Sequence, residues 1–523
     1  MDPMTELLKK LYRRLGPLIL VVGLVLLWTP WASAQSPAQQ PRTGGATSPA
    51  PRAPESGSTD KVSPATLDHG PQDKTSDTST PQKQKISPKE AEELFHDVDQ
   101  ILQFASKDTG LPIKKEVKRR LTSRDEVVAY LEKTMAEDKD AQRLRRSELV
   151  LKKFGLLPRD FDLQTFLVAL LREQVAGYYD PKTETVNLLD WIEIEQQRPV
   201  LAHELTHALQ DQYVVLEKWL KAGNADLNDK KQPTAADIEN DETAEARQAV
   251  IEGQAMIVLV DYMLAPTGQS ILASPQIADA LKEGMLVGTA DSIEFKNAPL
   301  FLKEELTFPY RYGLDFEAEL LRTGGKDKAF AAALSNPPRT TRQIMEPKTY
   351  LSGERIEPMR LPDFERDFKN YERFDVGAIG EFDVAILVDQ YAGREASHDL
   401  YPHWRGGYYY AARPKGDPSA PLALLYVSRW SSPEKASAFA AVYAQSLAKR
   451  YKHVHDVGQD GKNPPENLEK VESLTGTHTW LTEEGPVVIE VAGDRVLITE
   501  SLDQPTTEHL EQELLVTVVA VEK

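Results

Sequence analysis

The sequence predicts an α+β protein, in which a mainly helical domain with a small sheet precedes a second α+β domain. Two observations lead to this prediction. Between residues 88 and 335, apolar side chains recur at helical spacing, with one hairpin pattern at 177–189. From about Gly380 onward, strand patterns alternate with helical ones instead.

Length, charge and cysteine content limit the functions that are open to this chain. Its 523 residues are too many for one ordinary domain and indicate two or three. The formal net charge of −19 disfavours nucleic acid and anionic lipid as partners. There is no cysteine, which excludes disulfides, thiol catalysis and Cys-ligated metals. A tightly held transition metal must therefore be bound by His, Asp, Glu and water.

The N-terminal region has the pattern of an export signal followed by a linker. Residues 1–34 combine early Lys and Arg residues, an apolar stretch at 15–28 and the small-residue site Ala32-Ser33-Ala34, which predicts a signal peptide. Residues 35–86 are rich in Pro, Ser and Thr, which predicts a disordered linker. We expect an exported protein, periplasmic or extracellular, that this segment can tether to membrane or wall. An uncleaved N-terminal anchor is the alternative.

The folded part is expected to begin with a helical lead-in at residues 87–160. Ser87, Pro88 and Glu90 form the pattern of a capping box with proline in the first turn. The next domain, residues 161–375, starts with a helix and a hairpin that turns at Asp180-Pro181. Its helices are expected at 162–176, 199–220 (opened by Pro199), 242–264, 275–285 and 314–335.

The last domain, residues 376–523, is expected to contain strands and two helices. Each predicted strand is a short apolar run bounded by turn residues, and Gly493-Asp494 joins the last two. The strands are expected at 422–427, 478–481, 487–491 and 495–500, and the helices at 433–450 and from Thr506 onward.

The chemistry of the chain is concentrated in the run His203-Glu204-Leu205-Thr206-His207. Positions i and i+4 of a helix share one face, so the two imidazoles meet at one point, as two ligands of a catalytic zinc ion do. Glu204 is placed to act as general base on a zinc-bound water. The alternative is a surface helix whose two histidines bind nothing.

A catalytic zinc ion needs a third protein ligand. A third histidine on the metzincin spacing is excluded, because Tyr213 stands at its position. Glu252 lies in an apolar run at 250–258, where an unpaired charge is costly unless it binds a metal. Gly253 would let this helix approach the motif helix closely. The alternatives are a Glu252 paired with Arg247, and Glu245 as the ligand.

Residues 165–350 resemble the gluzincin-type zinc metallopeptidases. The His203–His207 run, the downstream Glu252-Gly253-x-Ala255 and the preceding hairpin carry the resemblance. It implies a mainly helical, zincin-like metallopeptidase domain with a small edge-strand sheet. One Zn²⁺ ion would be held by His203, His207 and Glu252, with Glu204 as the base. Strand 185–189 would be the edge strand of the cleft.

Further site residues are expected around these ligands. Thr185, Val186 and Asn187 of the expected edge strand would pair with an extended peptide substrate. Asp211, one turn beyond His207, could orient a ligating histidine, unless it is a solvent-exposed carboxylate. Tyr310 and Tyr312 are candidate oxyanion donors, unless they belong to an aromatic packing loop.

A second, finer resemblance concerns residues 336–347. This segment is similar to one in secreted bacterial proteins of the zincin group, where a histidine often stands at the position of Glu346. The alternative is a structural proline-rich loop.

The sequence thus predicts a secreted zinc metallohydrolase of the HExxH type, a peptidase acting on a peptide or protein substrate. Two alternatives stay open: a catalytically inactive zincin-fold binding or structural module of the cell envelope, and an enzyme that hydrolyses another amide in wall material. The presence of Glu204 favours an enzyme, because an inactive relative has no need of it.

Overall fold

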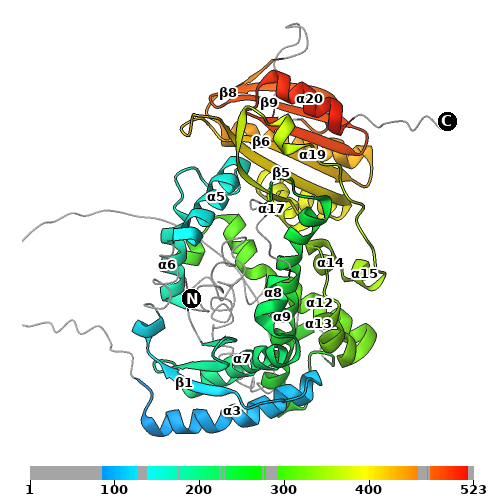
Figure 1. The fold of residues 1–523 in the computed structure, drawn as a ribbon. Helices are drawn as coiled ribbons and strands as arrows, with labels where there is room; N and C mark the ends of the chain where they lie inside the picture. The colour runs from blue at the N-terminus through cyan, green and yellow to red at the C-terminus, as the bar shows by residue number, and fades with distance from the viewer. Residues whose placement is uncertain are drawn as a thin grey trace, which may run out of the picture. The chain divides into compact units, whose positions relative to one another are not determined.

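A computed structural model of the chain describes residues 85–127, 138–174, 177–222, 227, 230–273, 276–277, 292–457, 468 and 471–515 (Figure 1). All of these residues belong to one compact unit. The predicted signal peptide and residues 35–84 of the predicted linker lie outside the described residues. So does most of the helix that was predicted at 275–285.

The fold is α+β, as predicted, with a helical region that contains a small sheet and a second region built on a larger sheet. The helices of the first region are α3 (Pro88–Thr109), α5 (Asp138–Phe154), α6 (Leu163–Gln174), α7 (Ile194–Val214), α8 (Leu216–Lys221), α9 (Ala235–Leu264), η5 (Ala265–Thr267), α11 (Ile293–Asn297), α12 (Leu300–Asp327), the π-helical η7 (Lys328–Ala332), α13 (Ala333–Ser335), α14 (Thr341–Met345) and α15 (Pro347–Leu351).

The capping box at the start of α3 is confirmed. The Ser87 hydroxyl accepts a hydrogen bond from the Glu90 N–H, and the Glu90 carboxylate accepts one from the Ser87 N–H at 2.6 Å. The predicted opening of the motif helix at Pro199 was wrong, because α7 already begins at Ile194. The buried Gln197 side chain explains the earlier start, since its amide bonds both backbone groups of Leu189 at the end of the preceding strand.

The small sheet has three strands in the order β1-β3-β2: β1 (Lys118–Thr122), β2 (Tyr178–Asp180) and β3 (Thr185–Leu189). β3 pairs with β2 in antiparallel and with β1 in parallel orientation. The expectation that β3 is an edge strand was therefore wrong. β1 was hidden in the sequence by its Lys and Arg residues, whose charges are paired on the surface, as in Arg119–Asp99 and Arg120–Glu126.

Helix α9 is the centre of the helical region and packs against both α7 and α12. Together with η5, the segment Ala235–Thr267 is long and apolar enough to cross a membrane by length and composition, but 67% of its apolar 18-residue stretch is buried inside the protein. This burial is that of a core helix. α9 and α12 touch at Gly253 and Gly313: a Cβ atom on Gly253 would come within 2.2 Å of the Gly313 carbonyl oxygen.

The second region is built on a seven-stranded sheet whose neighbouring strands are all antiparallel. Its order is β4-β5-β6-β10-β9-β8-β7. The strands are β4 (Tyr371–Ala378), β5 (Trp404–Pro414), β6 (Ala423–Trp430), β7 (Val454–Asp456), β8 (Gly476–Thr482), β9 (Gly485–Ala492) and β10 (Arg495–Glu500). The remaining helices are α16 (Phe364–Asp367), α17 (Glu381–Ala392), α18 (Arg394–Leu400), η8 (Tyr401–His403), α19 (Pro433–Arg450) and α20 (Gln504–Leu514).

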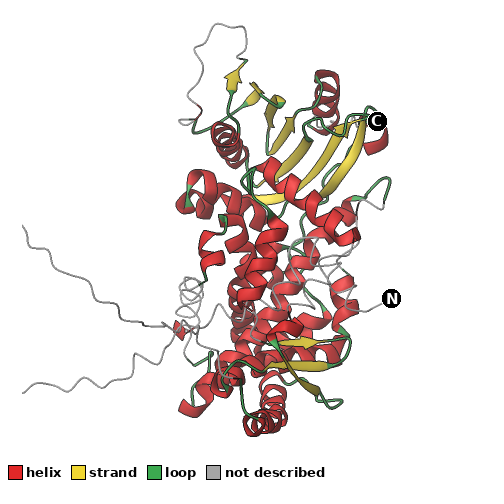
Figure 2. Ribbon diagram, turned by 90° about the vertical axis from the view of Figure 1, so that its left-hand side faces the viewer, coloured by secondary structure: helices red, strands yellow, loops and turns green. Residues whose placement is uncertain are grey.

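Helices cover both faces of this sheet (Figure 2). On β6, Leu424 and Tyr426 belong to the core that includes α17 and α19, whereas Leu425 and Val427 pack with α16 and α20. The alternation follows from the two-residue period of a strand, and it explains why 422–427 is apolar throughout. The predictions of α19 and β10 are confirmed to the residue.

Helix α9 also joins the sheet to the helical region. The Asp241 carboxylate accepts a hydrogen bond from the Ala378 N–H at 2.9 Å. The next residue, Glu242, accepts one from the Thr341 N–H at 2.6 Å, and Gly380 lies against the same carboxylate. These contacts fix the N-terminal half of α9, whose C-terminal half carries Glu252.

Candidate metal centre

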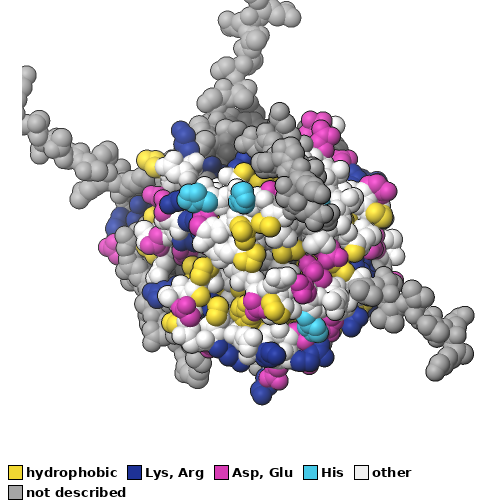
Figure 3. Space-filling view, turned by 90° about the horizontal axis from the view of Figure 1, so that it is seen from above, with side chains coloured by type: hydrophobic (Ala, Val, Ile, Leu, Met, Phe, Trp, Pro, Cys, Tyr) yellow, Lys and Arg dark blue, Asp and Glu magenta, His cyan; other side chains and the backbone are white. Residues whose placement is uncertain are grey.

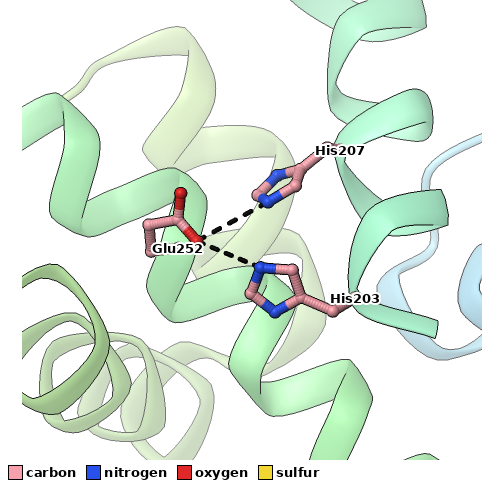
Figure 4. Close-up of side chains that lie close together, drawn as sticks. All are labelled: His203, His207 and Glu252. Atoms are coloured by element: carbon pink, nitrogen blue, oxygen red, sulfur yellow. Dashed lines mark hydrogen bonds and ion pairs between the residues drawn. The ribbon is translucent and has the colours of Figure 1, made fainter. Parts of the chain in front are cut away.

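Two helices bring three metal-ligating side chains together. His203 and His207 lie one turn apart on α7, and Glu252 projects from α9 toward both (Figure 4). All three side chains are at most 1% exposed. Residues 201–212 of α7 are buried without interruption, so the alternative of a surface helix was wrong.

The distances between the ligand atoms suit a single ion. Glu252 Oε2 lies 3.1 Å from His203 Nε2 and 3.6 Å from His207 Nε2. Ligands about 2.0–2.1 Å from a tetrahedral zinc ion lie about 3.3 Å from one another. The two measured distances bracket this value, and the three ligand atoms lie within 4.8 Å of one another. These residues could therefore hold a metal ion with little rearrangement.

Unsatisfied polar atoms also point to a missing partner at this place. Among the described residues, His207 Nε2 and Glu204 Oε1 are buried and have no hydrogen-bond partner. An orphaned buried polar group costs about 1–3 kcal/mol, so the fold retains these groups at a cost. Two imidazoles and a carboxylate form a donor set that zinc accepts well.

A chain of amides fixes the orientation of His207. Gln254 donates from Nε2 to the carbonyl oxygens of Ala329 and Phe330 at 2.7 and 3.2 Å, so its Oε1 is left to accept from Gln210 Nε2 at 2.9 Å. Gln210 Nε2 also donates to the Ile251 carbonyl at 3.0 Å.

Because carbonyl oxygens can only accept, both amides have a single consistent orientation. The Gln210 oxygen must therefore accept from His207 Nδ1–H, at 2.8 Å. The other ring nitrogen, Nε2, is the one that faces Glu252 (Figure 4). Gln210 thus does for His207 what Asp211 was expected to do.

The expectation for Asp211 was wrong in both forms. Its carboxylate is buried and accepts from the Tyr179 hydroxyl at 2.9 Å and from the Leu216 N–H at 2.8 Å. Neither partner is a histidine. The Asp211 side chain turns toward Leu216, beyond the C-terminal end of α7. Asp211 instead anchors Tyr179, whose backbone N–H donates to Glu204 Oε2 at 2.8 Å.

Strand β2, not β3, lies next to the motif. Tyr179 of β2 directs its N–H away from β3 and toward Glu204. The three residues of β3 predicted to bind substrate are occupied within the sheet: Thr185 and Val186 pair with β2 and β1, and the Asn187 amide accepts from Thr122 and donates to the Thr185 carbonyl. That prediction was therefore wrong for Thr185, Val186 and Asn187.

Of the two candidate tyrosines, the structure brings only Tyr310 to the centre. Its ring lies 6.3 Å from that of His203, with 26° between the planes. Tyr312 packs against Phe308 and Phe382 instead, so its assignment to the site was wrong. Both tyrosines lie on helix α12 and not in the packing loop of the alternative, and positions two apart on a helix point to nearly opposite sides.

The alternatives for Glu252 are also resolved. Arg247 donates to the Trp219 carbonyl oxygen and stacks on the Trp219 ring, and it forms no pair with Glu252. Glu245 is not part of the cluster of ligand atoms. Gly253 faces Gly313, so it permits a close approach of α9 to α12. We had expected it to permit a close approach to the motif helix instead.

Residues 336–347 lie outside the centre. Glu346 is 3.2 Å from Arg342, which also bonds Glu354 at 2.8 Å and the buried Glu381 at 2.7 Å. The segment thus takes part in an ion-pair network between α14 and α17, which fits the structural alternative.

Burial and charge shift the pKa values of the four central residues in different directions. Burial raises the pKa of Glu204 to about 8 and lowers that of His203 to about 4. Burial opposes the charged forms of His207 and Glu252 too, but their mutual attraction outweighs it, raising the pKa of His207 to about 9 and lowering that of Glu252 to about 2. Without metal, these shifts favour the charged forms of His207 and Glu252, whose Nε2 and Oε2 atoms lie 3.6 Å apart.

A second group of possible ligands is less suited to a cation. Asp367, His509 and Glu513 lie close together where α16 meets α20. Arg366 donates to Asp367 at 2.6 Å and to Glu513 at 2.8 Å, so a cation already compensates these carboxylates.

No family model, no curated protein and no solved structure matches the chain. The site therefore has to be argued from its own geometry. The sequence motif identified His203, Glu204, His207 and Glu252 as one group. It missed Gln210, Gln254 and Tyr179. The two glutamines had one signal in the sequence, their apolar surroundings on buried helices. Tyr179 had none.

Proposed function

We propose that the chain is an exported, zinc-dependent metallohydrolase that cleaves peptide bonds, of the HExxH type and similar to the gluzincins. The observation that carries this proposal is the arrangement of three ligand atoms around one point with the carboxylate of Glu204 beside them. A purely structural ion pair would need neither a third ligand nor a second buried carboxylate. A bound zinc ion would supply a Lewis acid that polarises a carbonyl group and acidifies water.

Each residue around the ligands would then have a separate role in the reaction. Tyr179 N–H holds one oxygen of Glu204, which leaves Oε1 to take a proton from the attacking water and to pass it to the leaving amine. Gln210 accepts a hydrogen bond from Nδ1–H of His207, which fixes the ring so that Nε2 would face the metal.

The substrate is expected along the outer edge of β2. This edge is next to the motif. Its Tyr179 N–H is bonded to Glu204, so an extended peptide would pair with the remaining backbone groups of the strand. Tyr310, beside His203, is the candidate donor to the developing oxyanion.

The test compares three forms of the full chain reconstituted with zinc: wild type, Glu204→Gln, and Glu195→Gln as a control on the exposed side of the same helix. Hydrolysis of casein and of a peptide library is measured beside the zinc content. We expect all three to hold zinc, and Glu204→Gln alone to lose activity, by about 10²–10⁴-fold. Wild type that holds zinc but cleaves no faster than Glu204→Gln would instead favour the inactive envelope module.

A further inference from the structure

A pocket of about 600 Å³ shares no residue with the metal centre. Its volume is in the range of sites that hold small ligands, about 300–1,000 Å³. Five cationic side chains and one carboxylate line it: Arg146, Lys230, Lys231, Arg373, Lys415 and Glu365. We call this the basic pocket. Such an excess is unusual in a chain of net charge −19, and on the face drawn in Figure 3 side chains of both signs are interspersed.

Arg373, which lines the pocket, is held in place by several contacts. Its guanidinium lies 5.7 Å from the ring centroid of Phe364 and 5.5 Å from that of Tyr410, and these two rings stack 4.6 Å apart. The same guanidinium donates to the carbonyl oxygens of Lys230 and Lys231. A cation fixed by rings and carbonyls is positioned before any ligand arrives, which lowers the entropic cost of binding.

The positive charge of the pocket is only partly compensated, although Lys230 forms an ion pair with Asp237. Within the described part of the chain, Arg373 and Lys415 pair with no carboxylate, and Lys415 donates to the Lys369 carbonyl at 2.7 Å. Lys231 is 3.6 Å from Glu365, but both side chains are largely exposed, so this ion pair is weak. Gathered like charges raise the free energy of the empty pocket, and an anion between them would lower it.

We propose that the basic pocket binds a small ligand that carries at least two negative charges on phosphate or carboxylate groups. Arginine and lysine N–H groups form charge-assisted hydrogen bonds with the oxygens of both groups. Phe364, Phe368 and Tyr410 are nearly fully buried, so they offer little apolar surface to a ligand. The ligand is therefore a compact polyanion and not an amphiphile.

Calorimetric titration of the purified full chain tests this proposal, with pyrophosphate and citrate as separate probes. The two probes present their charges on phosphate and on carboxylate groups, so the tighter one identifies the group that the pocket prefers. We expect saturable binding of one probe per chain, weakened by added salt because exposed lysines contribute.

The variant Lys231→Glu with Lys415→Glu should weaken that binding about tenfold or more, a loss of about 1.4 kcal/mol. The control, Lys449→Glu with Lys452→Glu, has the same change in net charge on exposed residues outside the pocket, and Lys449 also donates to a carbonyl. Lys231→Glu alone serves if the double variant does not fold, since that side chain is 88% exposed. The absence of saturable binding of both probes to the wild type, or an equal loss in the control, would overturn the proposal. The readout is binding alone, so it is independent of the metal centre.

Discussion

Two of the buried carboxylates, Glu500 in the large sheet and Glu252 in the helical region, differ strongly in character. Both are fully buried, and the pKa of each is lowered to about 2 by its partners against the opposing effect of burial. Glu500 is bonded by the guanidinium of Arg450 and by the hydroxyls of Tyr443 and Tyr451. Both of its carboxylate oxygens therefore accept hydrogen bonds.

Glu252 has no fixed cation. Its partners are two imidazoles and the Gln248 amide, and unsatisfied atoms of His207 and Glu204 lie beside it. An imidazolium can lose its proton to solvent and then bind a metal through the freed nitrogen, whereas a guanidinium stays protonated. The comparison separates a closed structural ion pair from a buried carboxylate whose partners can exchange a proton for a metal ion.

Glu500→Gln should have the largest effect on stability. It leaves Arg450 buried without its counter-charge, which costs about 3–5 kcal/mol in the free energy of unfolding. Urea denaturation measures this loss, with the exposed Glu508→Gln as a control that should stay within about 0.5 kcal/mol of wild type. A loss below about 1 kcal/mol for Glu500→Gln would show that the two carboxylates are alike.

Glu252→Gln should have a smaller effect on the stability of the metal-free protein, because no fixed cation is left unpaired. The zinc affinity, in contrast, should fall more than about 100-fold, beyond what the loss of an orienting residue costs. The matched control is Glu245→Gln, a buried carboxylate on the same helix that should keep its zinc. Loss of zinc in Glu245→Gln and retention in Glu252→Gln would reverse the assignment of the third ligand.

Gln210→Leu should weaken zinc binding about 10- to 100-fold, because it removes the acceptor that orients His207. Gln197→Leu is the control: it too is a buried glutamine of α7, but it bonds the end of β3. A competitive titration against a chromophoric chelator separates the two. Equal affinities for both variants would mean that Gln210 serves only the packing of the helices.

The zinc affinity should depend on pH with a definite sign. The pKa of His207 is raised to about 9 without metal, so below that pH a proton must leave before zinc can bind. The apparent affinity should therefore rise about tenfold per pH unit between about pH 6 and 8. An affinity that is independent of pH, after correction for the chelator, would contradict the ion pair between His207 and Glu252.

The residues that the sequence identified best are those with a strict spacing. His203, Glu204 and His207 follow from one helical turn, and Glu252 from a lone charge in an apolar run. α19 and β10 follow from caps and turns on either side. These signals are local, and tertiary contacts do not alter them.

The errors concern features that depend on distant partners. Strand β1 consists largely of basic residues, and only its pairing with β3, more than 60 residues later, makes it a strand and turns β3 from an edge into the centre. Asp211 and Gln210 are neighbours in sequence, and which of them orients His207 is decided by the position of Gln254 on another helix. Tyr312 was assigned to the site together with Tyr310, but both lie on α12, where positions two apart point to nearly opposite sides.

The central claim is that His203, His207 and Glu252 together hold one zinc ion. Metal analysis of the purified full chain, loaded with excess zinc and freed of loosely bound metal, tests it most directly. The account predicts one zinc ion per chain in the wild type and none in Glu252→Gln. A wild type that retains no stoichiometric zinc under these conditions, or an equal content in both proteins, would contradict it.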